Sequence, residues 1–371
     1  MKGSHASKSA GKGKVVIHIV QHLSPGGLET LVLEMLRFAS KKDSVHIISL
    51  EGTRSDAFKK WQRLESVNGQ ITFLDKPDGI SFKVLYKLVK IFKHLKPDVI
   101  HTHHIGPLFY AGISARLAQF KMLIHTEHDA WHLNNPKAAR LQSLLLKHLK
   151  PYVVADANFV ANQIIQQLGY DRVCTIHNGI DCEKFSLGDK TIAREYFSIP
   201  EDKFIIGTAG RLEAVKGHEV LIKALSHLPE NVHLAIAGIG DRHSELLKLT
   251  AELGLDDRIT FLGLVKDMPQ FYQSLDLFCL PSLQEGFPLS TLEAQACGVP
   301  CVASDVGAVN ETLCPSSGAL VLPNQVELLV EALTNAISRK PYSPRSYILK
   351  HFDIRKMLLQ YASLTQEAAY E

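Results

Sequence analysis

The chain alternates short apolar runs with longer segments whose apolar residues recur at the spacing of a helix. In the first half, β-rich apolar runs are followed by segments such as 81–96 and 106–120, in which apolar residues return every three or four positions. This alternation predicts a parallel sheet covered by crossover helices. The strands predicted for the first half are 14–20, 44–50, 70–75, 98–103, 122–128 and 152–157.

A second series of the same kind begins after Asn178 and Gly179, a dipeptide typical of a turn. The two series predict an α/β protein with two Rossmann-like domains, residues 14–175 and 176–350, and a C-terminal helical segment, 351–371, that returns toward the first domain. We expect the active site in a deep cleft between the facing domains, at the carboxyl ends of the strands. The second series has predicted strands at 204–210, 232–238, 259–263, 275–282 and 299–304, and predicted helices around 217–228, 243–253, 268–274, 289–297, 325–337 and 354–370.

Length and composition agree with a two-domain protein. The 371 residues exceed what one hydrophobic core usually serves, and no apolar run reaches the length that spans a bilayer. The six cysteines show no C-x-x-C spacing, and several lie in apolar surroundings, which indicates free thiols in a reducing cytosol. Residues 1–13 are polar and rich in small side chains, so we interpret them as a disordered leader or a cloning remnant.

Charge is distributed unevenly along the chain. Residues 14–172 contain 21 Lys and Arg against 13 Asp and Glu, and residues 173–371 contain 17 against 25, so the two parts carry formal charges of +8 and −8. The basic part, with the lysine-rich face of helix 81–96 opposite Phe82, Leu88 and Phe92, suggests an anionic membrane surface as a partner. A solvated lysine face is the alternative. Nucleic acid is not expected, because a combined aromatic and basic platform is missing.

The segment GTAGRLEAVKGHEVLIKAL (207–225) runs from a predicted strand through a glycine-containing loop into a helix. Such a junction is suited to anions, because unpaired amide groups and the helix dipole point at the ligand. Arg211 and Lys216 add two cations there. Cations beside a departing diphosphate stabilise the transition state more than the ground state, because negative charge grows as the bond to the sugar breaks. By spacing alone, Arg211 and Lys216 are equally well explained as solvated loop charges.

The segment PSLQEGFPLSTLEAQACGVPCVASDVG (281–307) places Glu285 in a loop and Glu293 inside the following helix. A carboxylate accepts hydrogen bonds from vicinal hydroxyls, so we expect Glu293 at a ribose and Glu285 near the donor sugar. Gly286 lets the backbone approach a ligand closely, and the helix N-terminus offers amide donors. The alternative is a loop acid together with a partly buried helix acid in a salt bridge.

In this order and at these separations, GTAGRL...KG, AGIGD, FLG and PS-x-x-EGFP-x-x-x-LEA-x-A-x-GVP-x-VAS-x-VG resemble the second domain of glycosyltransferase family 4, retaining enzymes of the GT-B fold. The motifs are specific in the second half of the chain and looser in the first. In that family, the Arg and Lys of the first loop bind the donor diphosphate, and the two acids contact the donor sugar and the ribose. The resemblance therefore implies these roles for Arg211, Lys216, Glu285 and Glu293. The second half shows no departure from the motif, which argues against a binding-only relative.

The resemblance also implies donor contacts from three further loops. Backbone amides around 286–290 face the sugar and the diphosphate, although proline itself has no N–H to donate. The stretch FLGLVKD (261–267) packs on the nucleobase, and SPGGLET (24–30) approaches the diphosphate from the first domain, where an ordinary strand-helix connection is the alternative explanation. The implied positions are Gly26, Gly27, Leu264, Val265, Gly286, Phe287, Pro288, Leu289 and Ser290.

Histidines gather near two predicted strand ends of the first half. A lone histidine is more often a structural hydrogen-bonding residue, but the resemblance implies that His128 contacts the donor sugar near the reacting centre. We place His103 and Asp129 at the acceptor cleft. Alternate residues of a strand share a face, which raises the question of a metal at His101, His103 and His104. No carboxylate or cysteine stands at matching spacing, so we expect neither a metal nor another cofactor.

The expected activity is transfer of a sugar from a nucleoside diphosphate sugar to a hydroxyl of a saccharide or lipid-linked acceptor, with retention at the anomeric carbon. A UDP-sugar is the favoured donor and GDP-mannose the second candidate. The resemblance places the enzyme in bacterial surface polysaccharide or glycolipid synthesis, in the cytoplasm or peripherally on the inner face of the plasma membrane. The alternatives are a GT-B-fold epimerase and a catalytically silent protein that binds sugar nucleotides.

Overall fold

The computed structural model describes residues 13–339 and 342–367. The disordered leader was predicted for residues 1–13, and residues 1–12 lie outside the described range. The chain divides into two compact units: the first contains the described residues up to 154, together with 165–174 and those from 361 onward, and the second contains 155–164 and 175–360. Among the residues described, no helix is both long and apolar enough to cross a membrane.

The first unit is built on a seven-stranded sheet in the order β3-β2-β1-β4-β5-β6-β7. β1 pairs in parallel with β2 and β4, and β4 pairs in parallel with β5. The strand order therefore reverses at β1, where the chain returns from β3 to start β4 on the other side. The strands are β1 (Val15–Val20), β2 (Ser44–Ser49), β3 (Ile71–Phe73), β4 (Val99–His103), β5 (Leu123–Glu127), β6 (Tyr152–Ala155) and β7 (Val173–Thr175).

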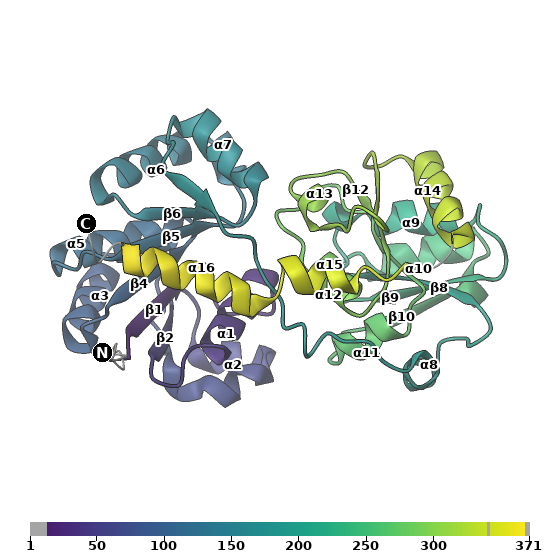
Figure 1. The fold of residues 1–371 in the computed structure, drawn as a ribbon, viewed down its shortest axis with the longest axis horizontal. Coiled ribbons are helices and arrows are strands. Elements are labelled where there is room, and N and C mark those ends of the chain that lie inside the picture. Colours follow the sequence, from purple (N-terminus) through teal and green to yellow (C-terminus); the bar gives the residue numbers. More distant parts are fainter. Residues whose placement is uncertain (1–12, 340–341, 368–371) are drawn as a thin grey trace, which may run out of the picture. The chain divides into compact units, whose positions relative to one another are not determined.

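Helices cover both faces of this sheet, as Figure 1 shows. α7 and α16 each contribute residues to both units. The helical segments are α1 (Gly27–Arg37), α2 (Arg54–Lys60), η1 (Gln62–Gln70), α3 (Phe82–Leu95), α4 (Ile105–Pro107), η2 (Leu108–Gly112), α5 (Ile113–Leu117), η3 (Trp131–Asn134), α6 (Pro136–Leu149) and α7 (Asn158–Leu168).

The second unit is built on a six-stranded sheet in the order β10-β9-β8-β11-β12-β13, with every pairing parallel. The strands are β8 (Phe204–Ala209), β9 (Val232–Ala237), β10 (Ile259–Gly263), β11 (Leu277–Leu280), β12 (Cys301–Ser304) and β13 (Ala319–Val321). The helical segments are α8 (Lys190–Phe197), η4 (Ala214–Lys216), α9 (His218–Leu225), α10 (His243–Glu252), η5 (Asp256–Arg258), α11 (Met268–Gln273), α12 (Leu289–Ala296), α13 (Val309–Thr312), α14 (Val326–Ser338), α15 (Arg345–His351) and α16 (Ile354–Glu367).

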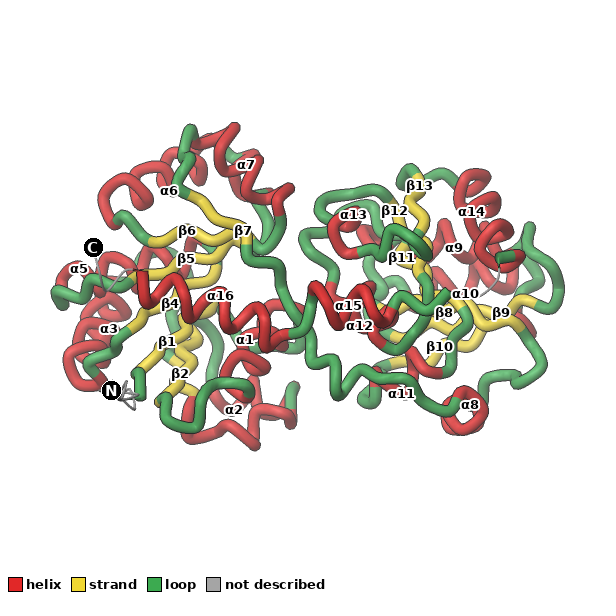
Figure 2. The backbone as a smooth tube through the Cα atoms, in the orientation of Figure 1, coloured by secondary structure: helices red, strands yellow, loops and turns green. Residues whose placement is uncertain are grey.

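The apolar runs read from the sequence are strands buried on both faces. Figure 2 shows the strands of each unit lying between helices. β9 is buried at all six positions, because side chains on both of its faces meet helices. The structure confirms the α/β class with two parallel-sheet units, and each predicted strand is present to within two residues at either end.

The prediction was incomplete for short and weakly patterned elements. β7 and β13 have three residues each, too few to display a period, and α2, α6, α7, α8, α13 and α15 were not predicted. The apolar face assigned to helix 81–96 was partly wrong, because Phe82 is 79% exposed while Val84, Leu88 and Phe92 are buried. Phe82 lies two residues before Val84, about 200° around the helix, which turns it away from the sheet.

Candidate active site

The reversal of strand order in the second unit brings two loops together. β8 and β11 are neighbours in the sheet although β9 and β10 separate them in the chain, so the loops that follow β8 and β11 leave the same edge side by side. The amide of Leu283 donates to the carbonyl of Val215 at 2.8 Å. Gly217 has φ +65°, and a Cβ there would lie 2.0 Å from the carbonyl oxygen of Pro281. Only glycine permits this approach without moving the backbone.

This junction places a lysine against a carboxylate. Lys216 Nζ donates to Glu285 Oε1 at 2.7 Å, and Ser282 Oγ donates to the same oxygen at 2.6 Å. The Lys216 side chain is 21% exposed and that of Glu285 is 9% exposed. A half-buried cation is thus held in one place by a nearly buried acid, close to the N-terminus of α9. Such a cation can interact with an anionic ligand without first being ordered.

Arg211 lies in the same loop but has a different partner. Its guanidinium donates to Glu213 at 2.7 Å, and its side chain is 68% exposed. Of the four charged residues predicted for the donor, the structure thus joins Lys216 with Glu285 directly and leaves Arg211 at the surface of the loop.

The loop after β11 continues into α12, whose first turn has open amide groups. Within the described part of the chain, no side chain caps the helix that starts at Leu289 after Pro288. Phe287 is buried against His177 and Phe352, with ring centroids 5.6 and 6.1 Å away, so its side chain anchors the loop in the core. The amides at Leu289 and Ser290 belong to this uncapped turn, which is suited to an anion.

The loop after β12 contacts the loop after β11 at Glu285 and Gly286. Gly307, after β12, has φ +56°, and a Cβ there would lie 1.9 Å from the carbonyl oxygen of Glu285. The amide of Ala308 donates to the carbonyl of Gly286 at 3.1 Å. The backbone at Glu285 and Gly286 is therefore held by a close glycine contact and a hydrogen bond.

Glu293 is held from another helix. The hydroxyl of Tyr272, a fully buried residue of α11, donates to Glu293 Oε2 at 2.8 Å. Burial raises the pKa of Tyr272 well above its ordinary value, and the nearby Glu293 carboxylate raises it further. Sequence reasoning missed Tyr272, because no local pattern connects α11 with α12. In the loop after β10, Leu264 is 61% exposed and Val265 is partly buried.

The strand order of the first unit reverses between β1 and β4, where the loop with Gly26 and Gly27 leads into α1. A Cβ at Gly26 would lie 2.3 Å from Glu29 Oε2, whereas a Cβ at Gly27 would meet nothing within 4 Å. Glu29 also pairs with His22 at 2.9 Å, and this hydrogen bond raises the pKa of His22. The backbone at Gly27 consequently borders open space.

A chain of histidines crosses the same sheet edge. His18 of β1 aligns with His101 of β4, and His103 lies two residues further along the same face. His18 Nδ1 is 3.2 Å from His103 Nε2, and His103 Nδ1 is 3.0 Å from Nε2 of His128, the residue after β5. Burial lowers the pKa of His18 to about 4 and that of His128 to about 3, so these imidazoles are neutral at pH 7.

Tyr361, in the part of α16 that belongs to the first unit, closes this face. His101 Nε2 is 2.7 Å from Thr126 Oγ1, which is 3.0 Å from the Tyr361 hydroxyl. The ring of Tyr361 lies 5.1 Å from that of His101. Tyr361 thereby covers His101, which is 2% exposed.

The opposite face of the sheet contains a separate network around Glu127. This fully buried carboxylate accepts from His125 at 2.9 Å and from Gln142 of α6 at 2.6 Å. Burial favours its neutral form, but the charges and hydrogen bonds of His125 and His104 outweigh burial and lower the pKa of Glu127. Asp129, beyond the strand, accepts from the amide of Trp131 at 3.3 Å.

His18, His101 and His103 each place one nitrogen within 4.8 Å of the other two, a separation that a metal ion could bridge. The rings of His101 and His103, however, lie 4.2 Å apart and are tilted by 31°, and His18 and His103 already share a nitrogen–nitrogen contact at 3.2 Å. Sequence reasoning missed His18, although a histidine inside the otherwise apolar strand VVIHIV pointed to a buried side chain.

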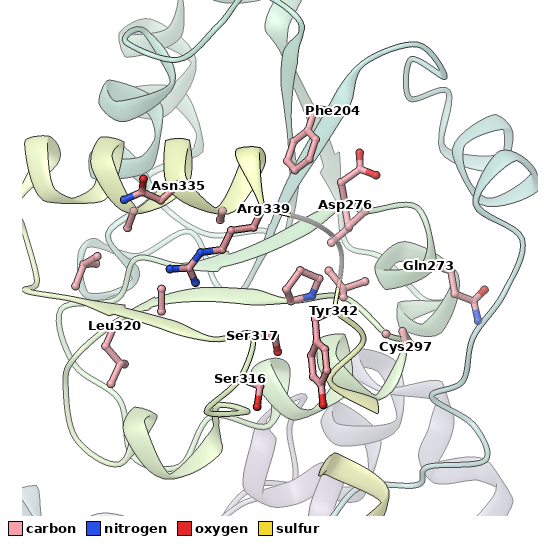
Figure 3. Close-up of a pocket in the computed structure, with 18 of the residues that line it drawn as sticks. Phe204, Gln273, Asp276, Cys297, Ser316, Ser317, Leu320, Asn335, Arg339 and Tyr342 are labelled. Carbon is pink, nitrogen blue, oxygen red and sulfur yellow. The ribbon is translucent and has the colours of Figure 1, made fainter. Parts of the chain in front are cut away.

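A cavity of about 660 Å³ lies at the other edge of the second sheet. Figure 3 shows Phe204, at the start of β8, and Asp276, just before β11, among its lining residues. The cavity is therefore at the amino ends of the strands, and its lining includes none of the residues predicted for the donor.

Two family models match the chain. The model described as Glycosyltransferase Family 4 matches residues 25–184, and the model described as Glycosyl transferases group 1 matches residues 189–348. Together they account for most of both units.

Individual relatives share less than 30% of their aligned residues with the chain in the two examples that follow. The chain is 29% identical over 268 residues to D-inositol 3-phosphate glycosyltransferase of Mycolicibacterium smegmatis, covering 66% of this chain but only 60% of that relative's length. It is 28% identical over 275 residues to UDP-Gal:alpha-D-GlcNAc-diphosphoundecaprenol alpha-1,3-galactosyltransferase of Escherichia coli. That match covers 70% of this chain and 71% of the relative's length. Among solved structures, Anabaena Alr3699/HepE in complex with UDP superposes with a TM-score of 0.83 at 23% identity over 95% of this chain and 100% of that one.

Proposed function

Because the chain belongs to glycosyltransferase family 4, we propose that it transfers a sugar from a nucleoside diphosphate sugar to a hydroxyl of a saccharide or lipid-linked acceptor, with retention at the anomeric carbon. The observation that carries this proposal is the contact of Lys216 with Glu285 at the reversal of strand order in the second unit. In open α/β sheets that position is where ligands bind. A cation, an acid and an uncapped helix start are all present there.

The role proposed for Lys216 follows from its position beside the start of α9. Lys216 and Arg211 bind the diphosphate, and the amides of Leu289 and Ser290 at the start of α12 donate to it. As the bond to the sugar breaks, negative charge collects on the departing oxygen, and a cation already held by Glu285 stabilises it without reorganising. The departing oxygen takes the proton of the acceptor hydroxyl on the same face of the sugar, which accounts for retention without an enzymic nucleophile.

Glu285 and Glu293 recognise the neutral parts of the donor in this proposal. Glu285 uses its second oxygen for a sugar hydroxyl while Oε1 stays with Lys216 and Ser282. Glu293, oriented by Tyr272, accepts from the ribose hydroxyls.

The remaining donor contacts come from the base-side loop and from the first unit. In the proposal, the exposed Leu264 and its neighbour Val265 pack on the nucleobase. Gly27, which faces open space, and Gly26 approach the diphosphate through their backbone. His128 meets the donor sugar and Asp129 the acceptor.

UDP is the proposed nucleotide, with GDP-mannose as the alternative donor. The E. coli relative carries UDP-Gal in its name, and the Anabaena structure is a complex with UDP; another structure of that Anabaena protein is described as a complex with UDP-glucose. UDP is therefore proposed because similar proteins have UDP or a UDP-sugar in their names or titles. Pathway and acceptor follow the same reasoning, since the E. coli relative acts on a diphosphoundecaprenol-linked sugar by name.

Incubation of the chain with UDP-glucose, UDP-galactose, UDP-N-acetylglucosamine and GDP-mannose, with nucleoside diphosphate release as the readout, tests the proposal. Release with one UDP-sugar, increased by an acceptor, is the expected result. Tight binding of a nucleotide without release from any donor would favour the silent binding protein. Interconversion of sugar nucleotides without net release would favour an epimerase.

We also propose that the enzyme works in the cytoplasm, docked peripherally on an anionic membrane surface through its basic first unit. α3 exposes Phe82 and Tyr86 beside Lys83 and Lys90, a combination that suits an interface between headgroups and acyl chains. Flotation with vesicles of phosphatidylglycerol is the test. Equal recovery of wild type and Lys83→Glu/Lys90→Glu on these vesicles would contradict the docking.

A further inference from the structure

We propose that His103 is a positioning residue that decides which ring nitrogen of His128 carries the proton. The effect of this proton position on how His128 meets the donor sugar rests on the proposed function. The coupling of the rings themselves rests on their hydrogen-bond geometry and on their burial.

The three rings are placed by the register of the sheet. β1, β4 and β5 are neighbours, and His18, His103 and His128 come from these strands or directly follow one of them. The two contacts join unlike nitrogens: His18 Nδ1 to His103 Nε2 at 3.2 Å, and His103 Nδ1 to His128 Nε2 at 3.0 Å. Both distances are those of N–H hydrogen bonds, so both nitrogens of His103 are engaged by other imidazoles.

A neutral imidazole has one N–H and one lone pair. Burial, together with the charges of the surrounding histidines, keeps the pKa of His103 well below its ordinary value, so the ring is neutral at pH 7. If His128 donates from Nε2 to His103 Nδ1, then His103 must donate from Nε2 to His18 Nδ1. In the reverse arrangement, His18 donates from Nδ1 to His103 Nε2, and His103 donates from Nδ1 to His128 Nε2.

It follows that all three rings carry the proton on the same kind of nitrogen. In the first arrangement each ring is protonated at Nε2, and in the second each is protonated at Nδ1. A switch from the first arrangement to the second moves one proton from His128 to His103 and one from His103 to His18. Since each ring stays neutral, His128 Nδ1 must also gain a proton from its surroundings and His18 Nε2 must lose one. The tautomer of His128 is thus tied to that of His18, which lies on the other side of His103 in β1.

This coupling bears on the proposed sugar contact. His128 Nε2 faces His103, so a donor hydroxyl would meet His128 through Nδ1. That nitrogen accepts in the first arrangement and donates in the second, and the ring plane is the same in both. His103 is 1% exposed and acts on the ligand through His128, which gives it a role different from direct contact at the acceptor cleft.

The experiment is nitrogen NMR of the full chain labelled with ¹⁵N-histidine. Ring nitrogens with and without a proton resonate far apart, and scalar couplings across the two N–H···N bonds identify the three rings in the wild type without any substitution. The expected result is one tautomer shared by His18, His103 and His128. Mixed tautomers among these rings, or absent couplings between them, would overturn the proposal.

The His103→Phe variant then tests the effect on His128. We expect its single tautomer to become a mixture and turnover to fall by about tenfold, with nucleotide affinity within twofold of wild type. His103→Asn restores an amide that can donate to His128 Nε2 or accept from it, so it should return a single tautomer to His128. A folded His103→Phe protein in which the His128 tautomer is unchanged would refute the inference.

Two controls separate the possible failures. His233→Phe removes another buried histidine, bonded to Thr260 at 2.8 Å in the second unit, and should leave the tautomer of His128 and turnover unchanged. Stoichiometric zinc in the purified chain that is lost in His18→Gln would show a metal centre in place of the hydrogen-bonded chain and would overturn the proposal. If no donor is turned over by the wild type, the proposed function fails while the NMR result still decides the coupling.

Discussion

Replacing Lys216 with alanine removes the cation that the structure holds against Glu285 beside the proposed diphosphate. The Ser282 hydroxyl still donates to the Glu285 carboxylate at 2.6 Å, and the backbone contacts of Gly217 and Gly307 do not depend on the lysine side chain. We therefore expect the variant to fold and to lose chemistry more than nucleotide binding.

The size of the loss follows from charge and distance. Departure of the diphosphate adds about one negative charge, and a full charge about 3 Å from the ammonium interacts by about 5.5 kcal/mol at an effective dielectric constant of about 20. With about half of that charge developed in the transition state, the loss is about 3 kcal/mol, or about 100-fold in turnover. This agrees with the effect of removing one preorganised donor from a developing oxyanion, about 100- to 1,000-fold.

The assay is single-turnover release of nucleoside diphosphate, with calorimetric binding of the nucleotide and thermal unfolding measured on the same samples. Lys223→Ala is the matched control, because Lys223 is exposed on α9 and forms a weak surface ion pair, with its Nζ 4.0 Å from Glu219 Oε1. Its turnover should stay within about twofold of wild type, as expected for a surface pair worth about 0.5 kcal/mol or less. Turnover of Lys216→Ala equal to that of Lys223→Ala would refute the electrostatic role.

Four further predictions follow from other contacts. Glu293→Ala should weaken nucleotide binding by about 10- to 100-fold, because it removes a charged acceptor from the ribose, and calorimetry that shows unchanged affinity would discard this role. Tyr272→Phe, which keeps the acid but removes its donor at 2.8 Å, should have a smaller effect in the same measurement. His128→Ala should reduce turnover more than nucleotide affinity, and wild-type turnover in a steady-state assay would exclude the residue from the site. The folded pKa of His18, about 4, lies below its unfolded value, so its stabilising contribution is present above pH 6.5 and is lost as the pH falls toward 4. Urea unfolding should show a free energy lower by about 2 kcal/mol at pH 5 than at pH 7 from this group alone, and a pH-independent value would contradict its neutral burial.

The sequence by itself determined the features that depend on neighbouring residues. Alternating apolar runs and helical periods were enough to predict every strand except β7 and β13 to within two residues at each end, because a strand buried on both faces must be continuously apolar. The glycine-containing loop that presents Lys216 was also predicted between a strand and a helix. The structure adds that Gly217 has φ +65°, a left-handed conformation that favours glycine.

Only the tertiary structure decided which distant residues meet. Lys216 and Glu285 are 69 residues apart and are brought together because the strand order reverses at β8. His18 reaches His103 across 85 residues through the pairing of β1 with β4, a register that no local pattern encodes. Backbone preferences act over a few residues, whereas sheet pairing is chosen by the burial of whole faces, and for that reason the histidine chain and the partner of Glu293 could not be predicted.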